Sequence, residues 1–153
     1  MNGQLPLHNM ENKISFSIKG IEIVNSAIMA PAGVGAVYNF NFELKFRTII
    51  NQKEGVLSVF SDAVIKDLSI NTQVGQYSAL FHYAVSDLEN VLIKNGQNPS
   101  EIPQPLLNAL LGISASTLRG MMFEAFKGTF LHDAILPVVD IMALQPELMP
   151  TPN

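Results

Sequence analysis

Histidine and aspartate are the residue types of this 153-residue chain that could do chemistry if their spacing allowed it. The three histidines, His8, His82 and His132, lie in separate segments, and none belongs to an H-x-x-x-H or H-E-x-x-H pattern. His132 precedes Asp133, but neighbours in a chain need not face each other. The chain has zero cysteines, which excludes a thiol nucleophile, a disulfide and thiolate metal ligands. We therefore expect no metal site.

Glycine and aspartate give no catalytic pattern either. Gly33 and Gly35 begin a G-x-G, but Tyr38 stands where a dinucleotide fingerprint has its third glycine, and no helix is expected after it. A G-x-S-x-G elbow is absent from the sequence. Three aspartates are spread through the strand region, where a polar strand face or a turn is their simplest interpretation: Asp62, Asp67 and Asp87. We expect a protein that is not an enzyme and takes no cofactor.

The first half of the chain has the period-2 alternation of β-strands. Residues 13–28 alternate apolar and polar side chains, and the phase flips after Gly20, which is typical of a β-bulge in one long, bent strand. Further strands are expected at about 39–47, 56–65 and 77–85. Hairpin-length loops between them predict a four-stranded antiparallel sheet.

The second half changes to helical spacing over residues 104–128. Pro105 suits the first turn of a helix, and Lys127 followed by Gly128 suits its end. Apolar residues recur between them at spacings of three and four: Leu118, Met121, Met122, Ala125 and Phe126. Strands followed by helices predict an α+β fold with helices packed on one face of the sheet.

A chain of 16.7 kDa fits one domain, which we expect at residues 13–144. Residues 1–12 and the proline-rich 145–153 are expected to be flexible ends. The first twenty residues lack the apolar run of a signal peptide, and no run of about 20 apolar residues predicts a membrane span. With the absence of cysteine, these features indicate a cytoplasmic protein without membrane insertion.

Charge is scarce in this sequence. Only 14% of residues are charged, against roughly 25% in an average soluble domain. Hydrophobic residues make up 48%, and the mean hydropathy is +0.25. This favours a surface that other chains cover, although asparagine, serine and threonine could solvate it instead. The net charge of −4 and nine scattered basic residues argue against nucleic-acid binding.

Seven methionines and nine phenylalanines add adaptable apolar surface. Methionine is unbranched and polarisable, so it suits surfaces that meet several partners. The alternative is that these side chains fill the core, which is the simpler interpretation for any single one.

The helix and the segment after it resemble the SecB family of protein-export chaperones. Arg119 lies nine residues before a Gly-Thr-Phe at 128–130, and a Leu-Pro-Val follows at 136–138. Residues 18–23 resemble the family's first strand. Leu131 stands where the family usually has proline, and the C-terminal helix and zinc-binding tail of SecB are missing. The resemblance therefore implies a divergent SecB-like protein for which docking on the translocation motor is doubtful.

The resemblance implies an ATP-independent holding chaperone that binds unfolded polypeptides, for export or for a dedicated client such as an antitoxin. It also implies a dimer of dimers, with Leu118, Met122 and Ala125 in helix contacts between subunits. Arg119 is expected to anchor the helix through backbone carbonyls or a carboxylate, the alternative being a solvated surface arginine. Gly128 is expected to be structural.

Client contacts are expected near the strand–loop edges, at Ile21, Ile23, Met29 and Tyr38. These residues flank the predicted bulge and the glycine-rich loop, where side chains are least committed to a core. Two other function classes remain open. One is a small-molecule-binding or enzymatic α+β domain, and the other is a structural subunit with one fixed protein partner.

Overall fold

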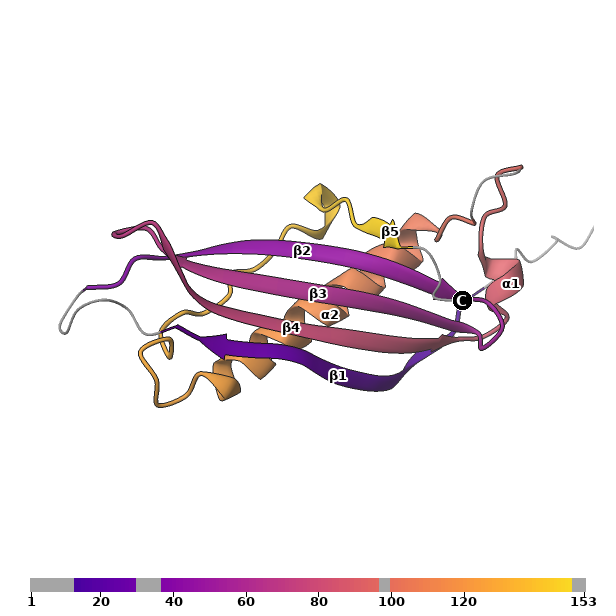
Figure 1. Cartoon of the computed structure of the whole chain (residues 1–153). Helices are drawn as coiled ribbons and strands as arrows, with labels where there is room; N and C mark the ends of the chain where they lie inside the picture. The colour runs from indigo at the N-terminus through magenta and orange to yellow at the C-terminus, as the bar shows by residue number, and fades with distance from the viewer. Residues whose placement is uncertain (1–12, 30–36, 97–99, 150–153) are drawn as a thin grey trace, which may run out of the picture.

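The structure is a computed structural model, and it describes residues 13–29, 37–96 and 100–149. A long sheet forms one layer, and a single long helix lies obliquely across one of its faces (Figure 1). The elements in chain order are β1 (Phe16–Ile28), β2 (Phe40–Asn51), β3 (Val56–Asp67), β4 (Thr72–Val85), α1 (Leu88–Val91), α2 (Gln104–Ala125), η1 (Ile141–Ala143) and β5 (Glu147–Met149).

The sheet has the strand order β1-β4-β3-β2-β5. The four long strands pair antiparallel, as the sequence predicts, and β2, β3 and β4 are longer than expected. The prediction of four strands is one short, because β5 adds a three-residue parallel strand to the outer side of β2. The reason is that Glu147–Met149 lies between two prolines, where the sequence favours extended backbone.

β1 bends at two places. The pairing of β1 with β4 shifts register between Ile18 and Gly20, which confirms the predicted bulge, and again between Ile23 and Asn25. The second shift has no glycine to mark it. Each bulge adds one unpaired residue and increases the local twist of the strand. These two shifts lie in the strand at one edge of the sheet.

The core lies between the sheet and α2. Alternate residues of β3 and β4 point to the helix and are fully buried, among them Val59, Phe81 and Tyr83. The Tyr83 hydroxyl shares a 2.7 Å hydrogen bond with Oγ of Ser114 on α2. Burial raises the pKa of Tyr83 above its ordinary value, and the Ser114 bond acts in the opposite direction. The buried polar atoms of this pair are therefore satisfied.

The buried face of α2 includes residues that the sequence analysis assigned to subunit contacts. Leu118 and Met122 are 0% and 1% exposed and pack against the sheet of their own chain, so their assignment to a subunit interface is wrong. Both lie on the stripe that a helix must bury first, and in this fold the sheet covers it. Ala125 is exposed.

Two features fix the end of α2 and the chain after it. Gly128 has a φ of 76°, the left-handed conformation expected of a residue that ends a helix. Arg119 donates from Nε to the Leu136 carbonyl at 2.7 Å and from Nη2 to the Pro137 carbonyl at 2.8 Å. These carbonyl contacts are of the kind that its predicted anchoring role requires. They hold the segment after α2 alongside the helix.

α2 is also long and apolar enough to cross a membrane, judged by length and composition alone, and it is the one such helix in the described ranges. The expectation that no segment reaches that length is therefore corrected. The core helix of a soluble protein passes the same test, so this is weak evidence. Seven of its side chains are buried in the fold: Leu106, Leu110, Leu111, Ser114, Ala115, Leu118 and Met122.

Candidate polypeptide-binding surface

β1 is an edge strand that exposes large apolar side chains. It pairs with β4 on one side, and no described residue pairs with it on the other. Its outer side therefore presents backbone N–H and C=O groups to whatever approaches. Five of its large apolar side chains are 40–61% exposed: Ile18, Ile21, Ile23, Val24 and Ile28. Natural edge strands are usually shortened, charged or covered, and this one is long and apolar.

Ile21 and Ile23 project on the helix side of the sheet. They lie opposite Phe81 and Ala79 of β4, both of which are buried against α2. Residues directly opposite each other in an antiparallel pair share one face. α2 makes most of its contacts with the sheet on β3 and β4. The two isoleucines, 40% and 61% exposed, therefore line an uncovered strip beside the helix.

A second apolar region lies at the end of the sheet where β1 ends and β2 begins (Figure 1). The Tyr38 ring stacks on Phe40, with 5.5 Å between centroids and 11° between planes. The ring centroid of Phe130, from the segment after α2, lies 5.2 Å from that of Tyr38. We call these three residues the end cluster. Tyr38 is half-buried within it.

The β3–β4 turn extends the apolar surface at this end. Leu68 and Ile70 are 50% and 47% exposed, and Val37 is 91% exposed. The Leu68 amide donates to the Asn39 carbonyl at 2.9 Å, which fixes the turn beside the start of β2. Met29, 39% exposed, follows β1 and donates from its amide to β4.

Asp67 holds this turn in place. Its Oδ1 accepts from the Ser69 amide at 3.0 Å and from the Asn39 amide at 3.3 Å. The pKa of Asp67 is lowered, chiefly by the bond from the Ser69 backbone, because these donors favour the charged carboxylate. One carboxylate thus joins the end of β3 to the start of β2.

The four predicted client contacts therefore fall in two places. Ile21 and Ile23 lie in the middle of β1, whereas Met29 and Tyr38 lie at the end of the sheet. The predicted glycine-rich loop between those regions, residues 30–35, lies outside the described residues. Sequence reasoning missed three further exposed apolar residues of β1, Ile18, Val24 and Ile28. Apolar residues on both sides of the bulge were the available signal.

The other face of the sheet carries a polar chain that the sequence did not suggest. Ser58 Oγ lies 2.7 Å from His82 Nδ1, and His82 Nε2 lies 3.2 Å from Glu22 Oε1. This is the order of a serine–histidine–acid triad, built from residues 24 and 60 positions apart. Ser58 is the third residue of β3, and it lies opposite Ile49 of β2 on one side and His82 of β4 on the other. The chain of contacts links β3, β4 and β1 across this face.

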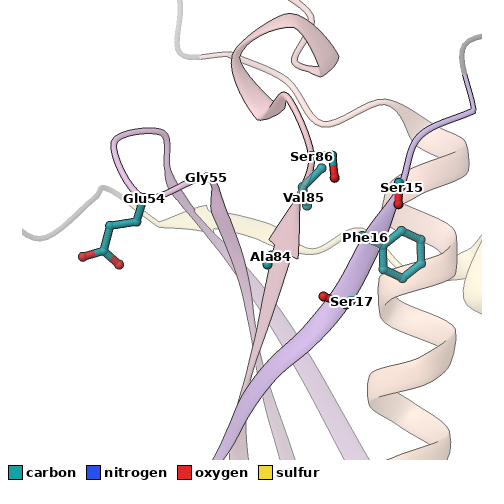
Figure 2. Close-up of a pocket in the computed structure, with 8 residues that line it drawn as sticks. All are labelled: Ser15, Phe16, Ser17, Glu54, Gly55, Ala84, Val85 and Ser86. Carbon is teal, nitrogen blue, oxygen red and sulfur yellow. The ribbon is translucent and has the colours of Figure 1, made fainter.

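A depression of about 250 Å³ lies at the opposite end of the sheet from the end cluster. Figure 2 shows that it lies between the start of β1, the β2–β3 turn and the end of β4, and that the Glu54 side chain points away from the other labelled residues. The Phe16 ring lies on the side of α2 and meets Tyr83 edge-on at 6.2 Å. The polar groups that line the depression do not converge on one point. Within the described ranges no group of three His, Asp or Glu residues could hold a metal ion.

Comparisons with known proteins identify the fold and no more. No protein-family model matches the chain, and no curated protein does. The structure is similar to the Mycobacterium tuberculosis SecB-like chaperone Rv1957, solved in complex with a ChAD peptide from the antitoxin HigA1. The TM-score is 0.52 at 10% identity, over 81% of this chain and 90% of that one. The chain thus has a SecB-like α+β fold.

A second similar structure is a protein of unknown function from Streptococcus agalactiae. It covers 83% of this chain and 98% of its own at 12% identity, with a TM-score of 0.44.

Proposed function

We propose that this protein is a holding chaperone that binds extended, apolar segments of unfolded polypeptides without nucleotide. The observation that carries the proposal is the apolar strip of β1, in which Ile21 and Ile23 are exposed beside an unpaired strand edge. Removing apolar surface from water is favourable by about 25 cal/mol per Å² buried, so an exposed apolar strip binds apolar side chains. An unfolded client supplies such side chains, and a holding function requires binding alone.

The end cluster continues this surface around the sheet. Tyr38 is fixed between Phe40 and Phe130, and it presents a rigid aromatic ring that loses little entropy on binding. Leu68 and Ile70 add exposed apolar area next to it. A client long enough to follow β1 to its end would meet both regions, which favours extended segments over folded partners.

A dedicated client is our preferred form of this function. The similar mycobacterial structure contains an antitoxin peptide bound to a SecB-like chaperone. At 10% identity this likeness shows the fold, and the dedicated client is our proposal. Service in protein export is the other form.

We propose further that the protein works as an oligomer, a tetramer built as a dimer of dimers. The unpaired edge of β1 suits antiparallel pairing with a second copy, which would leave the side chains of Ile21 and Ile23 on the helix side. Two such strips would then adjoin and form one longer client groove. Light-scattering mass measurement tests this, and a monomer at micromolar concentration would contradict it.

The function is tested by how well the protein keeps a chemically denatured enzyme in solution without nucleotide. Wild type should suppress aggregation, and Ile23→Ala should suppress it less while keeping its melting temperature. Ile93→Ala is the matched control, because Ile93 is 46% exposed and lies beyond α1, away from β1. No holding of several unrelated clients by wild type would contradict the proposal.

A further inference from the structure

The outer side of β2 is the second edge of the sheet, and part of it is occupied by the chain itself. β5 pairs there in parallel, with Glu147, Leu148 and Met149 opposite Arg47, Thr48 and Ile49. No described strand pairs with the outer side of residues 40–46. The described part of β5 thus pairs with three residues of this 12-residue strand.

The contact between β5 and β2 is slight. Arg47 Nε lies 3.7 Å from Glu147 Oε2, and these side chains are 38% and 81% exposed, so water and salt screen the pair. Leu148 is 43% exposed, so β5 is much less buried than the strands of the core. Short, exposed elements of this kind open locally far more often than the core does.

Space remains between the two segments. A depression of about 300 Å³ lies where the chain approaches β5, between residues 44–47 of β2 and residues 143–147. Closely packed elements leave few gaps of this size. The depression adjoins the unpaired part of β2, so a longer strand could continue from the position of β5 along that edge.

We propose that β5 is a built-in competitor for the second edge of the sheet, which an extended client segment displaces. This inference rests on the proposed holding function. A segment with an acidic residue followed by apolar ones would reproduce the contacts of Glu147 and Leu148 with β2. A client that also pairs along residues 40–46 would make more backbone hydrogen bonds than β5 does, and this offsets the tethering of β5.

A reversible lock tests the proposal in the full chain. The wild-type sequence contains no cysteine, so the double variant Arg47→Cys/Glu147→Cys has a single possible disulfide within one chain, and non-reducing electrophoresis separates it from links between subunits. The two positions are directly paired, and paired strands lie about 4.8 Å apart, within the Cα range that a disulfide spans. The probe is fluorescently labelled, reduced and carboxymethylated lactalbumin, an unfolded chain without free thiols.

Oxidation of the double variant should weaken binding of the probe, and reduction should restore it. Leu148→Pro, which removes a backbone donor from β5, should strengthen binding by about fivefold, because the competent state becomes more populated. Equal affinities for the oxidised, reduced and Leu148→Pro proteins would overturn this inference and leave the holding function standing. A wild type that binds no probe would overturn both.

Discussion

The two edges of the sheet differ in what lies over them. On the β2 flank, the chain after α2 returns across the sheet, and its apolar residues Val139, Ile141 and Leu144 pack against the core. On the β1 flank no described residue takes that place, and Ile23 remains 61% exposed. The same sheet therefore has one covered flank and one open flank.

The geometry of the layers explains why one helix cannot cover both flanks. A helix with its side chains is about 10 Å wide, and strands lie about 4.8 Å apart, so one helix covers about two strands. α2 lies over β3 and β4. Each outer strand needs a further element, and within the described ranges such an element lies over β2 and none lies over the middle of β1. The open flank is thus a consequence of the architecture, and the apolar residues of β1 make it a binding surface.

The largest expected effect comes from removing a core side chain, which should destabilise the whole fold and therefore both flanks. Leu118→Ala should lower the free energy of unfolding by about 2–5 kcal/mol, because Leu118 is fully buried between α2 and the sheet. Urea denaturation measures this. The exposed Ala125→Ser is the control and should change little. A stable Leu118→Ala protein with an altered oligomeric mass would return Leu118 to a subunit interface.

Loosening the covered flank alone should sharpen the comparison. Arg119→Ala removes two hydrogen bonds to the carbonyls of Leu136 and Pro137, and should cost about 1.5–3 kcal/mol. Hydrogen exchange should rise in β2 and the segment after α2 and stay unchanged in β1. Arg119→Lys keeps the charge without the two-pronged donor, and should recover part of the loss. Uniformly faster exchange in both flanks would show that the flanks are not independent.

The end cluster should contribute less to stability than to binding. Tyr38→Ala removes stacking on Phe40 and Phe130, which is worth about 0.5–1.5 kcal/mol. Holding of a denatured client should fall markedly at temperatures where the variant is folded. Tyr38→Phe keeps the ring and should behave as wild type. A Tyr38→Ala protein with full holding activity would restrict the binding surface to β1.

The smallest expected effect is a loss of stability at low pH, caused by protonation of Asp67 at the end of the sheet. Because the folded pKa of Asp67 is lowered, its bonds stabilise the fold above the unfolded value of about 3.9. This stabilisation is lost as pH falls through the folded pKa. The melting temperature of wild type should drop on acidification more than that of Asp67→Asn, which cannot ionise. Parallel curves for the two proteins would contradict this role of Asp67.

The sequence predicts the parts of this molecule whose pattern is local. Alternation in β1 and the glycine at its bulge, and the stripe of α2, gave the strands, the bend and the helix, because each repeats over neighbouring residues. The partner of the helical stripe is a tertiary fact. The pattern shows that Leu118 and Met122 must be buried, but only the folded chain shows that their own sheet buries them.

Other features depended on contacts between distant segments. The link between Glu22 and His82 joins residues 60 positions apart, and β5 is three residues long, too short for any periodicity. The candidate surface was predictable in part. Ile21 and Ile23 were identified from their position near a bulge, whereas the open flank that exposes them follows from the width of one helix.

The most direct test of the account is hydrogen exchange with and without a saturating amount of a denatured client. The open-flank account predicts that the client protects the amides at the start of β2 around Tyr38 and slows exchange in β1 beyond the protection that subunit pairing gives, while exchange at the β2–β3 turn and α1 is unchanged. Protection confined to α2 or to the polar face around Ser58 and His82 would contradict it.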